Sequence, residues 1–102
     1  MTDGVTVADA PDRKRYEATI DGRIAGYAEY LATGELTVLT HTEVDPAYEG
    51  RGVGSALARY ALDDIRERGR KALVVCPFIN GWIGRHPEYA DLIYHTQSKV
   101  TD

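Results

Sequence analysis

The sequence has little that would tie it to a membrane, to the cell exterior or to nucleic acid. It contains one cysteine, Cys76, so an internal disulfide cannot form and a disulfide-stabilised secreted scaffold is excluded. No apolar run approaches the roughly 18 residues of a transmembrane helix, and the N-terminal segment lacks the apolar stretch of a signal peptide. Acidic residues outnumber basic ones by 16 to 12, which disfavours a sequence-independent nucleic-acid binder. We therefore expect a cytoplasmic protein that binds neither membrane nor nucleic acid.

The length and composition are sufficient for one small domain. The chain has 102 residues, of which 43% are hydrophobic, and single cores typically occupy about 100–150 residues. Residues 1–14 are polar and are broken by Gly4 and Pro11, so we expect a flexible N-terminal arm. The folded domain is predicted over residues 15–95, and residues 96–102 are expected to form a C-terminal tail.

Three strands are predicted over about residues 15–20, 24–31 and 36–44. Apolar and polar residues alternate in the first, and Asp21-Gly22 is a strong signal for a hairpin turn. Gly26 is expected at a bulge or a close approach of two backbones. These three strands should form an antiparallel meander.

A helix, a short strand and a second helix are predicted to follow. Apolar residues recur at spacings of three and four over about residues 53–68, and Gly69 is typical of a helix C-terminus. Residues 71–75 are predicted to be a buried strand, parallel to the third strand because a helix connects the two. A second helix is expected over about residues 78–85, and residues 88–94 can add one or two helical turns. The fold class is therefore α+β: a three-stranded antiparallel meander, then helix, parallel strand and C-terminal helix.

The glycine-rich segment between the third strand and the first helix points to a phosphate-bearing ligand. In residues 49–55, alternating glycines at 50, 52 and 54 let the backbone approach a bulky anion. The N–H groups of the following helical turn would point at that anion, with the helix dipole in support. The alternative is a tight turn whose glycines serve packing alone.

Neither common nucleotide-binding motif fits this segment. A dinucleotide fingerprint requires G-x-G-x-x-G, and the third glycine position is taken by Ser55 or by Leu57, depending on the starting glycine. A P-loop requires Lys followed by Ser or Thr, which these glycines lack.

The order of elements and three short motifs resemble the GNAT superfamily of N-acetyltransferases, and in particular its compact, minimal-length branch. The motifs are HTEVDPAYEGRGVGSAL at 41–57, CPF at 76–78 and HPEY at 86–89. The resemblance implies an acetyl-CoA-dependent N-acetyltransferase that acts on an amine of a small molecule or a protein. Acetyl-CoA would be the cosubstrate, without a metal.

The resemblance also implies which residues bind CoA. In the family pattern Q/R-x-x-G-x-G/A, Gly52 and Gly54 match the small residues, whereas Glu49 departs from the first position and must turn away or pair, for example with Arg51. The strand before the turn should diverge from the parallel strand, leaving a wedge for the pantetheine arm. The residues implied are Thr42 and Val44 for pantetheine, Arg51, Gly52, Val53, Gly54 and Ser55 for pyrophosphate, and Asn80 for the CoA arm.

By the same resemblance, the thioester would lie close to His41, Glu43 and Cys76. Glu43 is a candidate general base, and its alternative is a surface residue that pairs with a cation. His41 shares its face by the period of two and suits proton transfer, or is a structural histidine. Cys76 either accepts the acetyl group or relays a proton, or it is a small buried hydrophobe. The usual tyrosine general acid has no clean counterpart, since Tyr89 could replace it only if the HPEY turn folds back.

Two other functions remain open. The chain could be a CoA-binding module with little or no transferase activity, because a core this short lacks the borders that form acceptor sites in larger family members. A phosphate- or nucleic-acid-binding adaptor is disfavoured by the net charge of −4. The sequence does not name the amine acceptor, and it allows a monomer or a homodimer.

Overall fold

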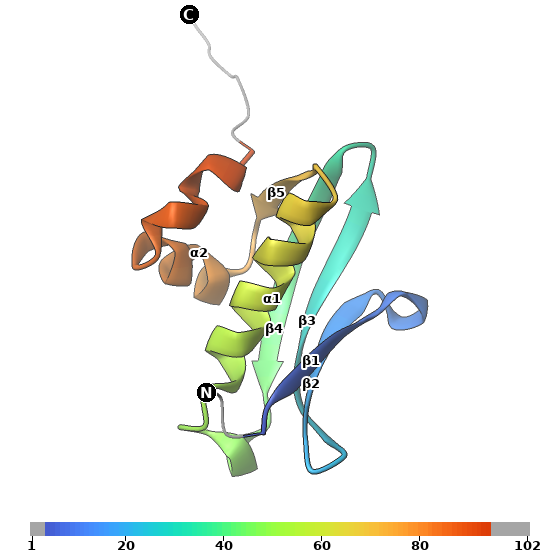
Figure 1. Cartoon of the computed structure of the whole chain (residues 1–102), viewed down its shortest axis with the longest axis vertical. Helices are drawn as coiled ribbons and strands as arrows, with labels where there is room; N and C mark the ends of the chain where they lie inside the picture. Colours follow the sequence, from blue (N-terminus) through green and yellow to red (C-terminus); the bar gives the residue numbers. More distant parts are fainter. Residues whose placement is uncertain (1–3, 95–102) are drawn as a thin grey trace, which may run out of the picture.

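A five-stranded sheet forms the frame of the structure, a computed structural model that describes residues 4–94. The strands lie in chain order, with β1 to β4 antiparallel and β5 parallel to β4 (Figure 1). Their bounds are Thr6–Ala10 (β1), Arg15–Ile20 (β2), Arg23–Thr33 (β3), Leu36–Val44 (β4) and Lys71–Val74 (β5). The predicted meander and the parallel strand after it are confirmed.

Two α-helices follow the meander, as predicted. α1 spans Val53–Glu67 and α2 spans Pro77–Gly84. Short 3-10 helices at Pro46–Tyr48 and Pro87–Leu92 precede α1 and follow α2. The mixed α+β class is therefore correct. Within residues 4–94, no helix is both long and apolar enough to cross a membrane.

The prediction of a flexible N-terminal arm is wrong for most of its length. Residues 6–10 form β1, which pairs with β2 along its whole length, and Pro11–Arg13 is a 3-10 turn. The physical reason lies far along the chain, because the hydroxyl of Tyr30 donates a hydrogen bond to Asp9 over 2.6 Å. The predicted tail, residues 96–102, lies outside the described residues.

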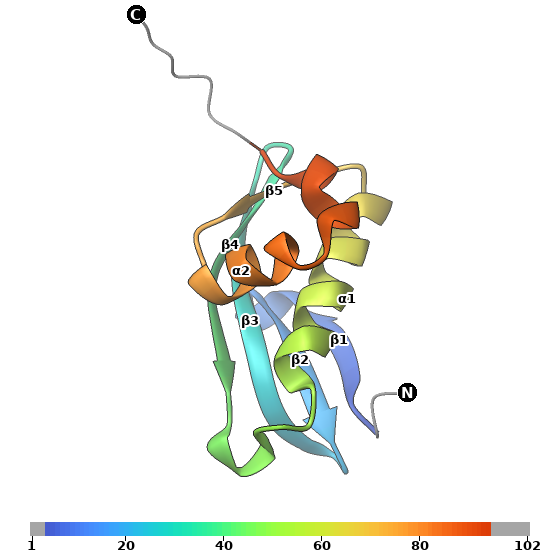
Figure 2. The ribbon, with the colours of Figure 1, turned by 90° about the vertical axis from the view of Figure 1, so that its left-hand side faces the viewer.

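The helices cover one face of the sheet and leave the other open (Figures 1 and 2). The alternation of β2 is as predicted, since Tyr16, Ala18 and Ile20 are buried beneath α1. α1 contributes Leu57, Leu62 and Ile65, all at 0% exposure. α1 therefore packs across the antiparallel part of the sheet.

The sheet opens between β4 and β5. β5 pairs with β4 only over Leu36–Leu39, and the carbonyl of Leu39 then accepts the N–H groups of both Val75 and Cys76. The chain then enters α2 and moves away, while residues 40–44 of β4 continue beside β3 alone. The expected wedge between the two parallel strands is therefore present.

Candidate functional site

The connection between β4 and α1 has the strand–turn–helix geometry that the glycines predict. The carboxylate of Asp45 accepts the N–H of Ala47 over 2.9 Å, which starts the 3-10 turn after β4. Gly50 and Gly52 follow with φ of 81° and 78°, a left-handed conformation that glycine adopts without steric cost. Gly52 is the N-cap of α1, so the helix begins immediately after the last reversal of the chain.

The first turn of α1 presents backbone donors without partners inside the helix. The first helical hydrogen bond runs from Ala56 N–H to the Gly52 carbonyl, so the N–H groups of residues 53–55 make none within α1. Gly52 carries no capping side chain, and the first turn contains no acidic residue. This end of α1 therefore offers uncompensated donors and the positive end of the helix dipole.

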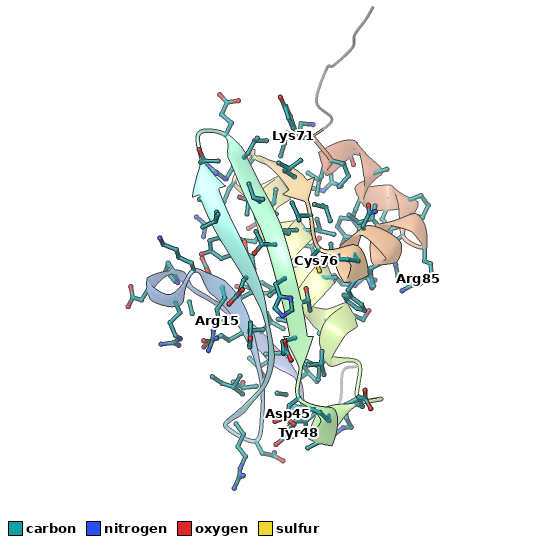
Figure 3. All side chains as sticks on the ribbon, turned by 180° about the vertical axis from the view of Figure 1, so that it is seen from behind. Arg15, Asp45, Tyr48, Lys71, Cys76 and Arg85 are labelled. Atoms are coloured by element: carbon teal, nitrogen blue, oxygen red, sulfur yellow. The ribbon has the colours of Figure 1, made fainter. Side chains whose placement is uncertain are left out.

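A cavity of about 480 Å³ lies over this turn. One wall is formed by Val44, residues 48–50 and residues 52–55. The other wall is α2, through Phe78, Trp82, Arg85 and the following His86. Figure 3 shows how α2 runs from Cys76, beside β4, out to Arg85, and places Tyr48 in the loop after β4.

Gly54 is needed for the contact between these two walls. A Cβ at Gly54 would lie 2.7 Å from the Cζ of Phe78, so the phenyl ring rests directly on the start of α1. Trp82, which is 2% exposed, donates its indole N–H to the hydroxyl of Ser55 over 2.9 Å. The two helices are thus joined at the cavity by one packing contact and one hydrogen bond.

Phe78, Trp82 and Arg85 are residues of the site that sequence reasoning did not identify. A signal was available: Phe78, Trp82, Arg85 and His86 are spaced i, i+4, i+7 and i+8, which places them on one helix face. That face points at the glycine turn rather than at the sheet alone.

The edge of β4 that faces the wedge offers backbone groups as well. The N–H of Asp45 donates to the Ala25 carbonyl in β3. Because bonding directions alternate along an antiparallel strand, Glu43 also faces β3, while Thr42 and Val44 direct their N–H and C=O groups to the open edge. The register shift of β4 opposite Glu29 and Tyr30 separates this stretch from the part that pairs with β5.

Cys76 contacts Thr42 at the narrow end of the wedge, where β5 leaves β4. The thiol is 2% exposed, and its sulfur lies 3.2 Å from the Thr42 hydroxyl oxygen. Cys76 is also the N-cap of α2, so its position is fixed by the end of β5 and the start of the helix.

His41 and Glu43 form a separate pair. His41 Nε2 lies 2.7 Å from Glu43 Oε1, and both side chains are more than half exposed. Their shared face, predicted from the period of two, is confirmed. Thr42 is offset from them by one residue and contacts Cys76, so Cys76 lies on the opposite side of β4.

Of three other residues considered from the sequence, one lines the cavity and two lie outside its lining. Glu49 lines it, and Glu49 forms no ion pair with Arg51 or with any other side chain in residues 4–94. Arg51 is exposed between two lining glycines, and Asn80 is exposed on α2 outside the lining.

Tyr89 is occupied elsewhere. Its hydroxyl donates to Asp63 over 2.7 Å, and Arg59 donates to it over 3.3 Å. Burial, followed by the Asp63 contact, raises the pKa of Tyr89. The HPEY turn does fold back, but onto α1, so this hydroxyl holds the 3-10 helix and is not aimed at the wedge.

Comparison with known proteins gives one consistent family. The family model described as GCN5-related N-acetyl-transferase matches residues 15–92. Protein NATD1 of Danio rerio is 36% identical over 92 residues, which cover 82% of this chain and 82% of that protein.

Two solved structures show the same fold. A GCN5-like protein of Staphylococcus aureus has a TM-score of 0.68 over 92% of both chains, at 17% identity. A GNAT-family acetyltransferase of Brucella melitensis, solved with acetyl-CoA, has a TM-score of 0.52 and 25% identity. That match covers 59% of this chain and 44% of the Brucella chain.

Proposed function

We propose that this chain, which belongs to the GCN5-related N-acetyltransferase family, transfers the acetyl group of acetyl-CoA to an amine of a small molecule or a protein. The observation that carries this proposal is the sequence of sites along β4 and α1. The N–H groups at the start of α1 border the cavity, Val44 of β4 lines it, and the open edge of β4 continues from Val44 to Thr42, whose hydroxyl contacts the buried Cys76.

The phosphate end of the cosubstrate belongs at the glycine turn. We assign the pyrophosphate to the backbone of Arg51, Gly52, Val53, Gly54 and Ser55, because backbone N–H groups at a helix start bind phosphate oxygens well. Glu49 places a carboxylate in the same cavity. This carboxylate would repel the pyrophosphate. The backbone N–H groups and the helix dipole offset that repulsion.

The pantetheine arm belongs along the open edge of β4. Its amide groups can pair with the free backbone groups of Thr42 and Val44, as a further strand would. Asn80 could assist only by reaching from outside the cavity lining. The thioester would then reach the narrow end of the wedge, beside Cys76.

The reaction removes a proton from the acceptor amine and releases the thiolate of CoA. We assign these two steps to opposite sides of β4. The amine nitrogen attacks the thioester carbonyl carbon, a C–N bond forms, and the C–S bond breaks. We assign Glu43, with His41 as its hydrogen-bonded partner, to receive the amine proton on the open face. The leaving CoA thiolate is protonated on the other side, where Cys76 is the nearest candidate donor.

Burial favours the proton-donor role of Cys76 over the acyl-acceptor role. At 2% exposure the thiol has little room for an acetyl group, and Thr42 restrains it. We expect no acetyl adduct in the intact mass after incubation with acetyl-CoA. We also expect Cys76→Ser to retain turnover within about tenfold, and Cys76→Ala to lose about 100-fold. An acetyl adduct that is absent from Cys76→Ala would make Cys76 an acyl acceptor instead.

Binding of CoA tests the proposed function directly. We expect calorimetric titration to detect CoA and acetyl-CoA, and Gly52→Asp to weaken both at least tenfold, because it adds a carboxylate at the phosphate position. Gly34→Asp is the matched control, since Gly34 also has a positive φ and open space but lies in the distant β3–β4 turn.

Three results separate the alternatives. Absence of CoA binding at millimolar concentration would refute the proposal. Equal losses in Gly52→Asp and Gly34→Asp would refute the placement of the phosphates. CoA binding without release of free CoA across a broad panel of amines would make the chain a CoA-binding module rather than an enzyme.

We also propose that the protein works in the cytoplasm as a monomer or homodimer. The free thiol of Cys76 supports the location, since cytosolic thiols are kept reduced.

A further inference from the structure

The far end of α2 places two basic side chains on the cavity wall opposite the glycine turn. Arg85 is the C-cap of α2 and His86 follows it, and both line the cavity. Arg85 is exposed and forms no ion pair with any carboxylate within residues 4–94. Arg66 and Arg68, by contrast, pair with Asp91 and Asp64. The Arg85 guanidinium is therefore available to a ligand in the cavity.

The imidazole of His86 is held rigidly at the same place. It stacks on the Trp82 indole, with ring centroids 3.7 Å apart and planes inclined by 12°. Its Nδ1 lies 2.9 Å from the Trp82 carbonyl oxygen. Because a carbonyl only accepts hydrogen bonds, Nδ1 carries a proton, and Nε2 becomes a second donor in the imidazolium form that a bound anion favours. No partner of Nε2 is found in the described part of the chain.

Trp82 connects this basic end to the glycine turn. Its indole N–H donates to Ser55, in the first turn of α1, while its carbonyl and its ring hold His86. The cavity thus has two separate positions for negative charge: backbone N–H groups on one wall, and the Arg85 guanidinium beside the His86 imidazole on the other. One phosphate group contacting the glycine turn would leave the second position unfilled.

We propose that Arg85 and His86 bind the 3′-phosphate of CoA, so that the protein discriminates CoA from its 3′-dephospho form. This inference rests on the proposed function. α2 runs from Cys76 at its N-cap to Arg85 at its C-cap, which is about 13 Å at 1.5 Å per residue. Arg85 therefore lies at the end of the helix away from the thioester, as the adenosine end of the ligand requires.

The type of charge supports the same assignment. A 3′-phosphate is a monoester that carries close to two negative charges, and guanidinium groups bind such oxygens in a planar, two-pronged geometry. The pyrophosphate, by contrast, is already provided for by the N–H groups at the glycine turn. Arg85 and His86 thus complete the recognition of the ligand at its second phosphate.

A comparison of two ligands on three proteins tests this inference. Calorimetric titrations with CoA and with 3′-dephospho-CoA would be run on the wild type, Arg85→Gln and Arg23→Gln. Arg23 is the exposed first residue of β3 and lies outside the cavity lining, so its substitution controls for the change in net charge.

We expect the wild type and Arg23→Gln to bind CoA about tenfold more tightly than 3′-dephospho-CoA. Arg85→Gln should lose that preference by weakening CoA alone. A wild type that binds both ligands equally, or an Arg85→Gln that weakens both equally, would overturn the assignment while leaving the proposed function intact. A wild type that binds neither ligand would instead overturn the proposed function.

Discussion

At Gly26, strand β3 passes under two other elements with no room for a side chain. A Cβ there would lie 2.7 Å from the carbonyl oxygen of Glu43 and 2.9 Å from Cγ1 of Val53. The carbonyl of Glu43 is part of the β4 backbone, and Val53 is the first residue of α1. The sequence predicted a bulge or a close approach at this glycine, and the close approach is confirmed.

We expect Gly26→Ala to lower the free energy of unfolding by about 2–3 kcal/mol, because the methyl group must displace backbone and not only a side chain. Gly81→Ala is the matched control. Gly81 lies inside α2, the nearest atom to its added Cβ is 3.9 Å away, and alanine should stabilise the helix by about 0.5–1 kcal/mol. Urea denaturation measures both. A Gly26→Ala protein as stable as the wild type would show that β3, β4 and α1 do not pack this closely.

At the scale of elements, the parts predicted well are those whose signals are local. Asp21-Gly22 and Gly69 mark the ends of elements within two or three residues, and the structure has them there. β1 was missed because its stability comes from distant partners. Asp9 is held by Tyr30, and its other oxygen lies 3.5 Å from Arg68, so neither contact is visible in a short sequence window.

The candidate site divides in the same way. The glycine turn and the face shared by His41 and Glu43 follow from spacing and strand period. The side of β4 on which Cys76 lies does not, because it depends on where β5 ends against Leu39. The cavity wall of α2 also needs the packing of Phe78 on Gly54, two residues that are more than 20 positions apart in the sequence.

At the scale of the whole molecule, the uncovered face of the sheet contains one buried charge among the described residues 4–94. Glu17 is 9% exposed. Its carboxylate accepts hydrogen bonds from Arg13 over 2.6 and 2.8 Å and from Arg15 over 2.7 Å. The hydrogen bond from Arg13 is the main cause that lowers the pKa of Glu17 to about 2, from a usual 4.5. The global stability should therefore depend on pH through this residue.

Because the pKa of Glu17 is lower in the folded than in the unfolded protein, its contribution is complete above about pH 5 and is lost as the pH falls toward 2. The Arg13 side chain is 57% exposed, so solvent screening limits this contribution to about 1–2 kcal/mol. We expect urea denaturation to show that Glu17→Gln is less stable than the wild type by this amount at pH 7. The difference should shrink steadily between pH 5 and pH 2.5. A difference that is unchanged at pH 2.5 would mean that Glu17 stabilises the sheet through packing and not through its charge.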